Sequence, residues 1–156
     1  MSEAISNRTR SLIARSLPVV QQRREALVQR MEAALAGLDG KESATGQAEV
    51  TAVVLVDLLL DEARQLVGSG AFGPLGYVTG EHYLLDITGR HYSRFGDALM
   101  PALRDLLSPA TPREVRTAWC DTFWAIVHAA LGVRSEAPVA AAGFGGGRYG
   151  SSSARQ

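Results

Sequence analysis

The sequence predicts an all-α fold. Strand signals are nearly absent, because no stretch alternates apolar and polar residues between turn residues. Apolar residues instead recur at steps of three and four, the spacing that places them along one face of a helix. Glycine, proline and polar clusters separate these periodic segments and mark where helices end. The three observations favour six to seven helices that pack in pairs.

The N-terminal half is expected to hold three helices. An apolar stripe covers residues 8–38, and Pro18 with the QQRRE segment after it is expected to divide the stripe into two helices. A polar turn at residues 39–46 then makes a short corner. Residues 47–67 form a helix that is apolar on more than one face and therefore buried, and it is expected to end at Gly68-Ser-Gly70, where glycine suits the left-handed cap.

The C-terminal half is expected to add three helices and a tail. Pro74 suits the first position of a short helix that ends near residue 85, and a second helix covers residues 91–107. A capping box at residues 111–114, with proline in the first helical position, begins the last helix. We place the domain at residues 1–132, because the composition changes to Ala, Gly and Ser afterwards and predicts a disordered tail at residues 133–156.

Charge and apolar patterning exclude several classes of partner. The 156 residues carry 16 basic and 16 acidic side chains, so the basic patch of a nucleic-acid binder is not expected. The longest apolar run, residues 52–60, is much shorter than the roughly 20 residues of a membrane span. With a single cysteine, Cys120, and no signal-peptide pattern, a cytoplasmic protein is expected.

Catalytic motifs are missing from the sequence. It contains no Ser-His-Asp order, no phosphate-binding glycine loop and no clustered Cys and His ligands, so we do not expect an enzyme. Glu32 and Asp57 are carboxylates in apolar helical surroundings. Ion pairs with Arg23, Arg24 or Arg64 are their expected role.

Two segments of the C-terminal half resemble a known family. EHY at residues 81–83 leads into GRHYSRFGDAL at residues 89–99, and TPREV at residues 111–115 leads into AW at residues 118–119. This pattern resembles the bacterial single-domain and flavohaemoglobin-like globins, and the likeness extends over about residues 16–131. The resemblance implies a globin-like helical fold that binds haem b (heme b) and, on its iron, a small diatomic ligand.

The resemblance assigns His82 as the axial iron ligand and thus the metal-binding residue. Assigning that role to His91 instead would delete the loop before the next helix, so His91 is expected at a helix start near the surface. Tyr92 and Phe95 belong to the matching segment and are expected beside the cofactor.

The other side of the implied haem departs from the family pattern. The Phe-Tyr pair of these globins falls on Met31 and Glu32, so Glu32 replaces the tyrosine that hydrogen-bonds oxygen. Counting back along the chain from the axial histidine places Val50 and Val54 over the iron. A small insertion at residues 68–73 would place Gln47 there instead. The set that stabilises oxygen is incomplete, so oxygen storage is not expected.

Three functions remain open from the sequence. The first is a haem-binding protein for sensing, ligand chemistry or tetrapyrrole handling. The second binds a linear tetrapyrrole, a bilin such as biliverdin, with Glu32 or Asp57 accepting hydrogen bonds from its pyrrole N–H groups. The third is a cofactor-free module that forms a homodimer through Trp124. Haem comes first, because the axial position is intact.

Overall fold

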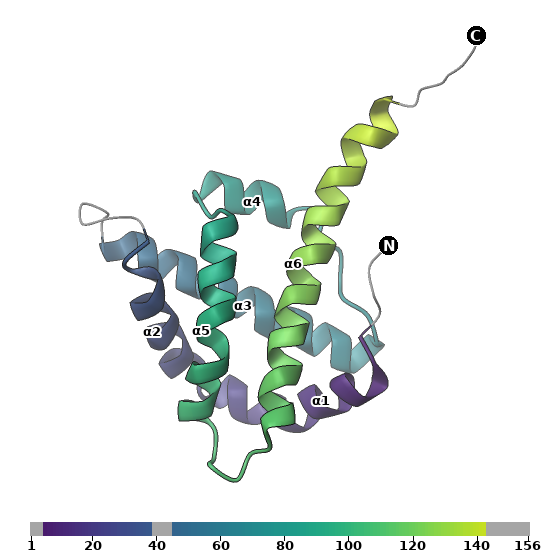
Figure 1. The fold of residues 1–156 in the computed structure, drawn as a ribbon. Helices are drawn as coiled ribbons and strands as arrows, with labels where there is room; N and C mark the ends of the chain where they lie inside the picture. The colour runs from purple at the N-terminus through teal and green to yellow at the C-terminus, as the bar shows by residue number, and fades with distance from the viewer. Residues whose placement is uncertain (1–4, 39–44, 143–156) are drawn as a thin grey trace.

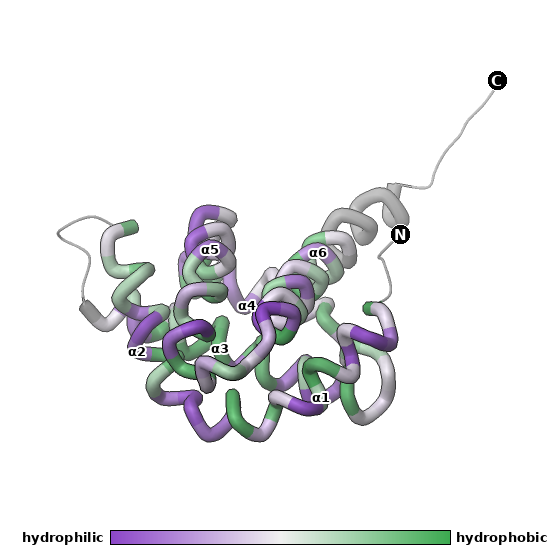
Figure 2. The backbone as a smooth tube through the Cα atoms, turned by 60° about the horizontal axis from the view of Figure 1, so that its bottom comes forward, coloured by the Kyte–Doolittle hydropathy of each residue, from purple (hydrophilic) through white to green (hydrophobic). Residues whose placement is uncertain are grey.

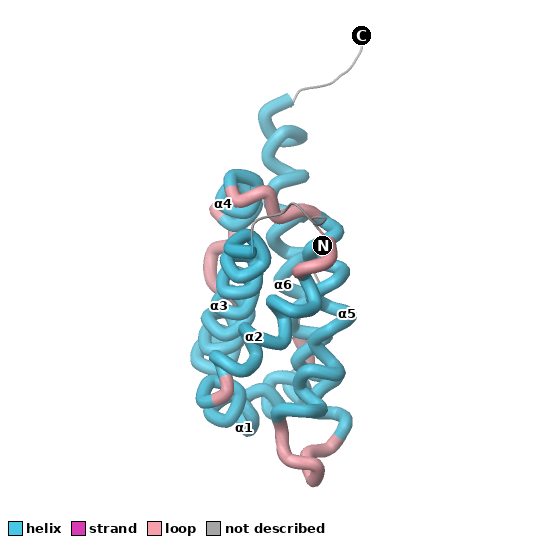
Figure 3. Tube along the Cα trace, turned by 90° about the vertical axis from the view of Figure 1, so that its left-hand side faces the viewer, coloured by secondary structure: helices cyan, strands magenta, loops and turns pink. Residues whose placement is uncertain are grey.

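The computed structural model describes residues 5–38 and 45–142, with side chains described for residues 5–38 and 46–132. Within these residues the chain forms six helices and no strand, so the all-α prediction is confirmed (Figure 1; Figure 3). The helices are α1 (Asn7–Gln22), α2 (Arg24–Leu35), α3 (Thr45–Ser69), α4 (Val78–Leu84), α5 (Gly89–Leu106) and α6 (Arg113–Ala142).

The N-terminal stripe divides into two helices as predicted, and the break lies at Arg23, within the QQRRE segment and not at Pro18. Pro18 is accommodated inside α1, and Arg23 has non-helical angles (φ −100°, ψ 18°) while its N–H still bonds the last carbonyls of α1. The helix start is secured at Ser6, whose side chain accepts a hydrogen bond from the Thr9 N–H at 3.1 Å. A single residue therefore separates α1 from α2.

The end of α3 and the start of α4 differ in how well the sequence predicted them. Gly70 has a φ of +84° and its N–H bonds the Leu66 carbonyl at 2.9 Å, which is the predicted left-handed cap. The predicted start of the next helix at Pro74 is wrong, because α4 begins at Val78. A turn at Leu75 intervenes, where the Val78 N–H bonds the Leu75 carbonyl.

The last helix extends beyond residue 132, where we placed the end of the domain. α6 continues to Ala142, so residues 133–142, which the sequence placed in a disordered tail, extend the helix. The remaining tail, residues 143–156, lies outside the described residues, as do residues 39–44 of the predicted short corner.

One continuous apolar core joins the helices. α1 packs on α3 and α6, α2 packs on α3 and α5, and α5 packs on α6. Hydrophobic and hydrophilic residues alternate along the helices, as expected where each helix turns one face inward (Figure 2). The largest fully buried side chains come from five of the six helices, among them Ile13, Met31, Leu59, Phe95 and Trp119.

Two polar links between helices complete the packing. The indole N–H of Trp119 donates to Ser16 Oγ at 2.8 Å, which satisfies a buried donor and joins α6 to α1. Arg24 donates to both carboxylate oxygens of Asp57 at 2.7 and 2.9 Å, which joins α2 to α3. The Arg24 partner expected for Asp57 is thereby confirmed.

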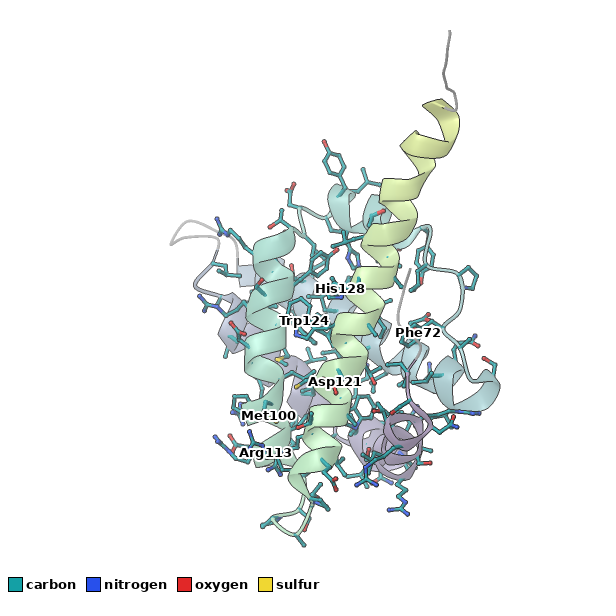
Figure 4. All side chains as sticks on the ribbon, turned by 45° about the vertical axis from the view of Figure 1, so that its right-hand side comes forward. Phe72, Met100, Arg113, Asp121, Trp124 and His128 are labelled. Atoms are coloured by element: carbon teal, nitrogen blue, oxygen red, sulfur yellow. The ribbon has the colours of Figure 1, made fainter. Side chains whose placement is uncertain are left out.

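At Gly96 a side chain of α6 lies directly against the backbone of α5. A Cβ added to Gly96 would lie 2.8 Å from Cε2 and 2.9 Å from Nε1 of Trp124, far inside van der Waals contact. Figure 4 shows Trp124 between these helices, with His128 further along α6. The Trp124 ring also meets Phe123 edge-on at 5.3 Å, and its side chain is partly buried.

Within the part of the chain that the structure describes, no helix is both long and apolar enough to cross a membrane.

Replacing Gly96 by Ala is expected to destabilise the fold by about 1–3 kcal/mol, because the added methyl overpacks the contact with Trp124. Gly68→Ala is the matched control, since Gly68 lies inside α3 with open space where the new methyl would go, and alanine favours helix. Urea unfolding of both variants gives the comparison. Equal stability of Gly96→Ala and the parent chain would contradict the close α5–α6 contact.

Candidate functional site

His82 on α4 is a buried polar side chain with a short hydrogen bond to a neighbouring helix. It is 2% exposed, and its Nδ1 lies 2.6 Å from the hydroxyl oxygen of Tyr92 on α5. Burial lowers the pKa of the imidazole, so the neutral ring predominates near neutral pH. In the tautomer in which Nδ1 donates to the Tyr92 oxygen, Nε2 of the neutral ring carries the lone pair that can ligate a metal.

The turn that follows α4 fixes the position of His82. The backbone N–H groups of Leu85 and Ile87 both bond the His82 carbonyl, at 3.1 and 2.9 Å. Between them Asp86 adopts a left-handed conformation with φ 61°, which few non-glycine residues other than Asp and Asn adopt. The chain thus reverses at once into α5, and this reversal brings Tyr92 back to the histidine.

His82 lines a groove of about 200 Å³ between α3 and α4. The apolar part of the wall comes from α3, and the other lining side chains are acidic or phenolic, apart from His82 itself. The lining residues are Val53, Val54, Asp57, Leu58, Asp61, Tyr77, Glu81 and His82. An apolar wall with one buried, neutral nitrogen donor is the arrangement of a small-molecule site.

Two side chains of α3 hold the α4 segment in place from either end. Gln47 Nε2 donates to the Leu85 carbonyl at 2.8 Å, just after α4. Glu62 Oε1 accepts the Gly73 N–H at 2.8 Å, in the loop before α4. Because each bond joins α3 to a different end of the α4 segment, they set the width of the groove between the two helices.

The structure brings some of the predicted site residues together. His82 and Val54 line the groove, Tyr92 contacts His82 from α5, and Gln47 bonds the Leu85 carbonyl just after α4.

Four other predicted residues lie away from the groove lining. Val50 is 41% exposed, Met31 and Phe95 are fully buried in the core, and Glu32 is partly buried on α2. Phe95 packs against Phe123 with ring centroids 4.7 Å apart. These residues support the packing around the site and do not line it.

His91 occupies the helix start that the sequence predicts, but it does not lie near the surface. It is 3% exposed, and its Nδ1 accepts the Thr88 N–H at 2.9 Å within a capping box of α5. The physical reason is that capping turns the ring back under the first turn of the helix.

Sequence reasoning missed Glu62. This carboxylate is 5% exposed, and burial raises its pKa although the Gly73 N–H opposes the shift. A signal was present in the sequence, because Glu62 falls on the buried stripe of α3 between Leu59 and Leu66. Helical spacing marks such a position, but it does not show that a backbone N–H eleven residues later will meet it.

The described residues offer little support for a multi-ligand metal centre or a reactive thiol. No group of three or more His, Cys, Asp or Glu side chains among them is placed to hold a metal ion. Burial raises the pKa of Cys120 to about 11, so its thiol stays protonated and the reactive thiolate is rare at neutral pH. His82 alone therefore offers a metal-ligating nitrogen in the groove.

Comparison with known proteins adds no constraint on this site. No protein-family model matches the chain, and no curated protein matches it significantly. The functional argument therefore depends on the groove and its histidine.

Removing the hydroxyl of Tyr92 is expected to destabilise the chain by about 1–3 kcal/mol, because Nδ1 of His82 then loses its partner in a buried site. The variant is Tyr92→Phe, and Tyr83→Phe on the exposed face of α4 is the control. Urea unfolding measures both. A Tyr92→Phe variant as stable as the control would show that the His82–Tyr92 hydrogen bond contributes nothing to the free energy of unfolding.

Stability is expected to fall as the pH drops below about 6.5, the ordinary histidine pKa. The folded-state pKa of His82 is lowered, so the unfolded chain binds the proton first and acid favours unfolding. His82→Gln should reduce the stability difference between pH 7.5 and pH 5.5 by on the order of 1 kcal/mol. His128→Gln, which alters an exposed histidine, should leave that difference unchanged.

Proposed function

We propose that this chain is a globin-like protein that binds a metal tetrapyrrole, haem, through Nε2 of His82. One observation carries the proposal: a buried, neutral histidine is held at Nδ1 by Tyr92 and lines a groove whose α3 wall includes Val53, Val54 and Leu58. Metal-bound histidines use one ring nitrogen as the ligand, and a hydrogen bond at the other fixes the tautomer. The likeness of the segments around His82 and Tyr92 to bacterial globins supports the same assignment.

The His82 imidazole is a suitable ligand for haem iron, but the groove is small for a haem group. A groove of about 200 Å³ is smaller than the roughly 300–1,000 Å³ of typical ligand sites. Binding therefore requires α4 to move away from α3. α4 has only seven residues, and its outer face is solvent-exposed, with Leu84 82% exposed.

The groove wall favours sensing or tetrapyrrole handling over oxygen storage. Bound haem iron supplies an open coordination position for a small diatomic ligand. The α3 wall offers Val53, Val54 and Leu58, which have no hydrogen-bond donor, and the amide of Gln47 is engaged with the Leu85 carbonyl. A wall without donors gives a bound oxygen molecule no polar stabilisation.

A cofactor-free helical scaffold is the second candidate function. The small volume of the groove favours it, as do the two hydrogen bonds from Gln47 and Glu62 that hold the α4 segment against α3. In this case the His82–Tyr92 pair would serve to fix the position of α4.

Visible absorption spectra distinguish these functions. The purified protein is titrated with hemin and, separately, with biliverdin, for the parent chain, His82→Ala and the control His128→Ala. We expect a sharp Soret band with hemin that His82→Ala loses and His128→Ala keeps. Red absorption with biliverdin that is the same in the parent chain and in His82→Ala would support bilin binding in place of haem binding. No spectral change with either compound would leave the cofactor-free scaffold as the remaining candidate function.

A further inference from the structure

The groove between α3 and α4 carries charge of one sign. Asp57, Asp61 and Glu81 line it, and no lysine or arginine belongs to its lining. The pKa of the Tyr77 phenol in the same lining is raised by burial first and then by neighbouring carboxylates. The groove therefore has a negative potential, which attracts a cation and repels an anion.

One of the three lining carboxylates is available to a ligand. Asp57 is held by Arg24, which donates to both of its oxygens at 2.7 and 2.9 Å. Asp61 forms an exposed ion pair with Arg64, three residues later on α3. Glu81 makes no ion pair with any residue that the structure describes. Its charge is therefore the one that a cationic ligand can neutralise without breaking an existing pair.

A second, independent feature of the groove is a buried acceptor without a partner. His82 lines the groove and is 2% exposed, and its Nδ1 is bonded to the hydroxyl of Tyr92. No residue that the structure describes bonds the other ring nitrogen, Nε2. In the tautomer in which Nδ1 donates, Nε2 is an acceptor, and buried acceptors in proteins are normally paired with a donor. An N–H group of a ligand would supply that donor.

The remaining lining determines the size and the body of the ligand. Val53, Val54 and Leu58 form the apolar part of the wall. The groove has a volume of about 200 Å³, and an apolar cavity of roughly 150 Å³ accommodates benzene. A molecule with one ring or a short alkyl chain therefore fits the groove at its observed width. The Tyr77 ring adds an aromatic side chain, whose face attracts cations.

We propose that this groove binds a small primary ammonium ligand, with Glu81 as its counter-ion and Nε2 of His82 as the acceptor for one of its N–H groups. The ligand class is an amine whose apolar body is no larger than one ring. Because such an amine fits without movement of α4, its binding does not depend on haem binding. The two ligands would exclude each other, since both use Nε2.

Three probes that share a phenyl ring separate the effect of charge from that of shape. They are 2-phenylethylamine, which is cationic at pH 7.5, the neutral 2-phenylethanol and the anionic 3-phenylpropanoate. Titrations followed by amide chemical shifts at low salt give the dissociation constants. We expect the parent chain to bind the amine at least about tenfold more tightly than the alcohol. The carboxylate should not bind.

The variant Glu81→Gln removes the counter-ion and keeps the shape of the side chain. It should weaken amine binding about fivefold or more and leave the affinity for the alcohol unchanged. The matched control is Glu49→Gln, an exposed glutamate of α3 outside the groove lining, which should bind the amine like the parent chain. High salt should weaken amine binding to the parent chain as well, because it screens the charge of the exposed Glu81.

Each contrary result overturns a stated part of the proposal. No amine binding, or equal affinity for the amine and the alcohol, would overturn it and would leave haem binding through His82 to its own spectroscopic test. An unchanged amine affinity in Glu81→Gln would overturn the role of Glu81. Shift changes that spare His82 and the α3 residues of the lining would show that the amine binds elsewhere, which would overturn the site.

Discussion

The crossing of α5 over α6 at Gly96 is the constraint on which the rest of the structure depends. Without a side chain at this position, the Trp124 ring lies directly against the backbone of α5. One residue away Phe95 stacks on Phe123, and one turn away Tyr92 reaches His82. Since a rigid helix transmits a displacement along its length, the α5–α6 distance also determines whether the tyrosine meets the histidine.

α4 depends on its neighbours for almost everything that positions it. A seven-residue helix is too short to be stable alone, and its outer face gains nothing from burial. It is held by packing on α6, by the Tyr92 hydroxyl on its inner face, and by side chains of α3 at both ends. An element held mainly by a few polar contacts is one that can shift without disturbing the core.

Two buried polar groups, one lining the groove and one holding the loop before α4, occupy positions where apolar side chains would give more stability. His82 is kept neutral by burial, and the Glu62 carboxylate is retained at a buried position with a single backbone N–H as its partner. Both groups lower the stability that apolar side chains would provide there, since buried polar atoms gain little net energy even when paired. A buried ionisable side chain that lines a groove, as His82 does, is typical of a binding site, where functional groups are kept although they lower stability.

The sequence by itself determined the helices and much of the core. The cap at Gly70, the apolar stripe of α3 and the buried face of α5 follow from spacing and backbone preference, which are local properties. Local preference also explains the main errors, because Pro74 suits a helix start that the neighbouring turn prevents, and the capping role of His91 concealed its burial.

Only the tertiary structure decided which residues form the site. The sequence singled out His82, Tyr92, Val54 and Gln47, but their meeting depends on the reversal at Asp86 and on the α5–α6 distance. Nothing in the local pattern indicates that Gln47 would bond the Leu85 carbonyl, 38 residues away. Such contacts join residues distant in the chain, and their geometry is fixed by how helices pack and not by the spacing within any one of them.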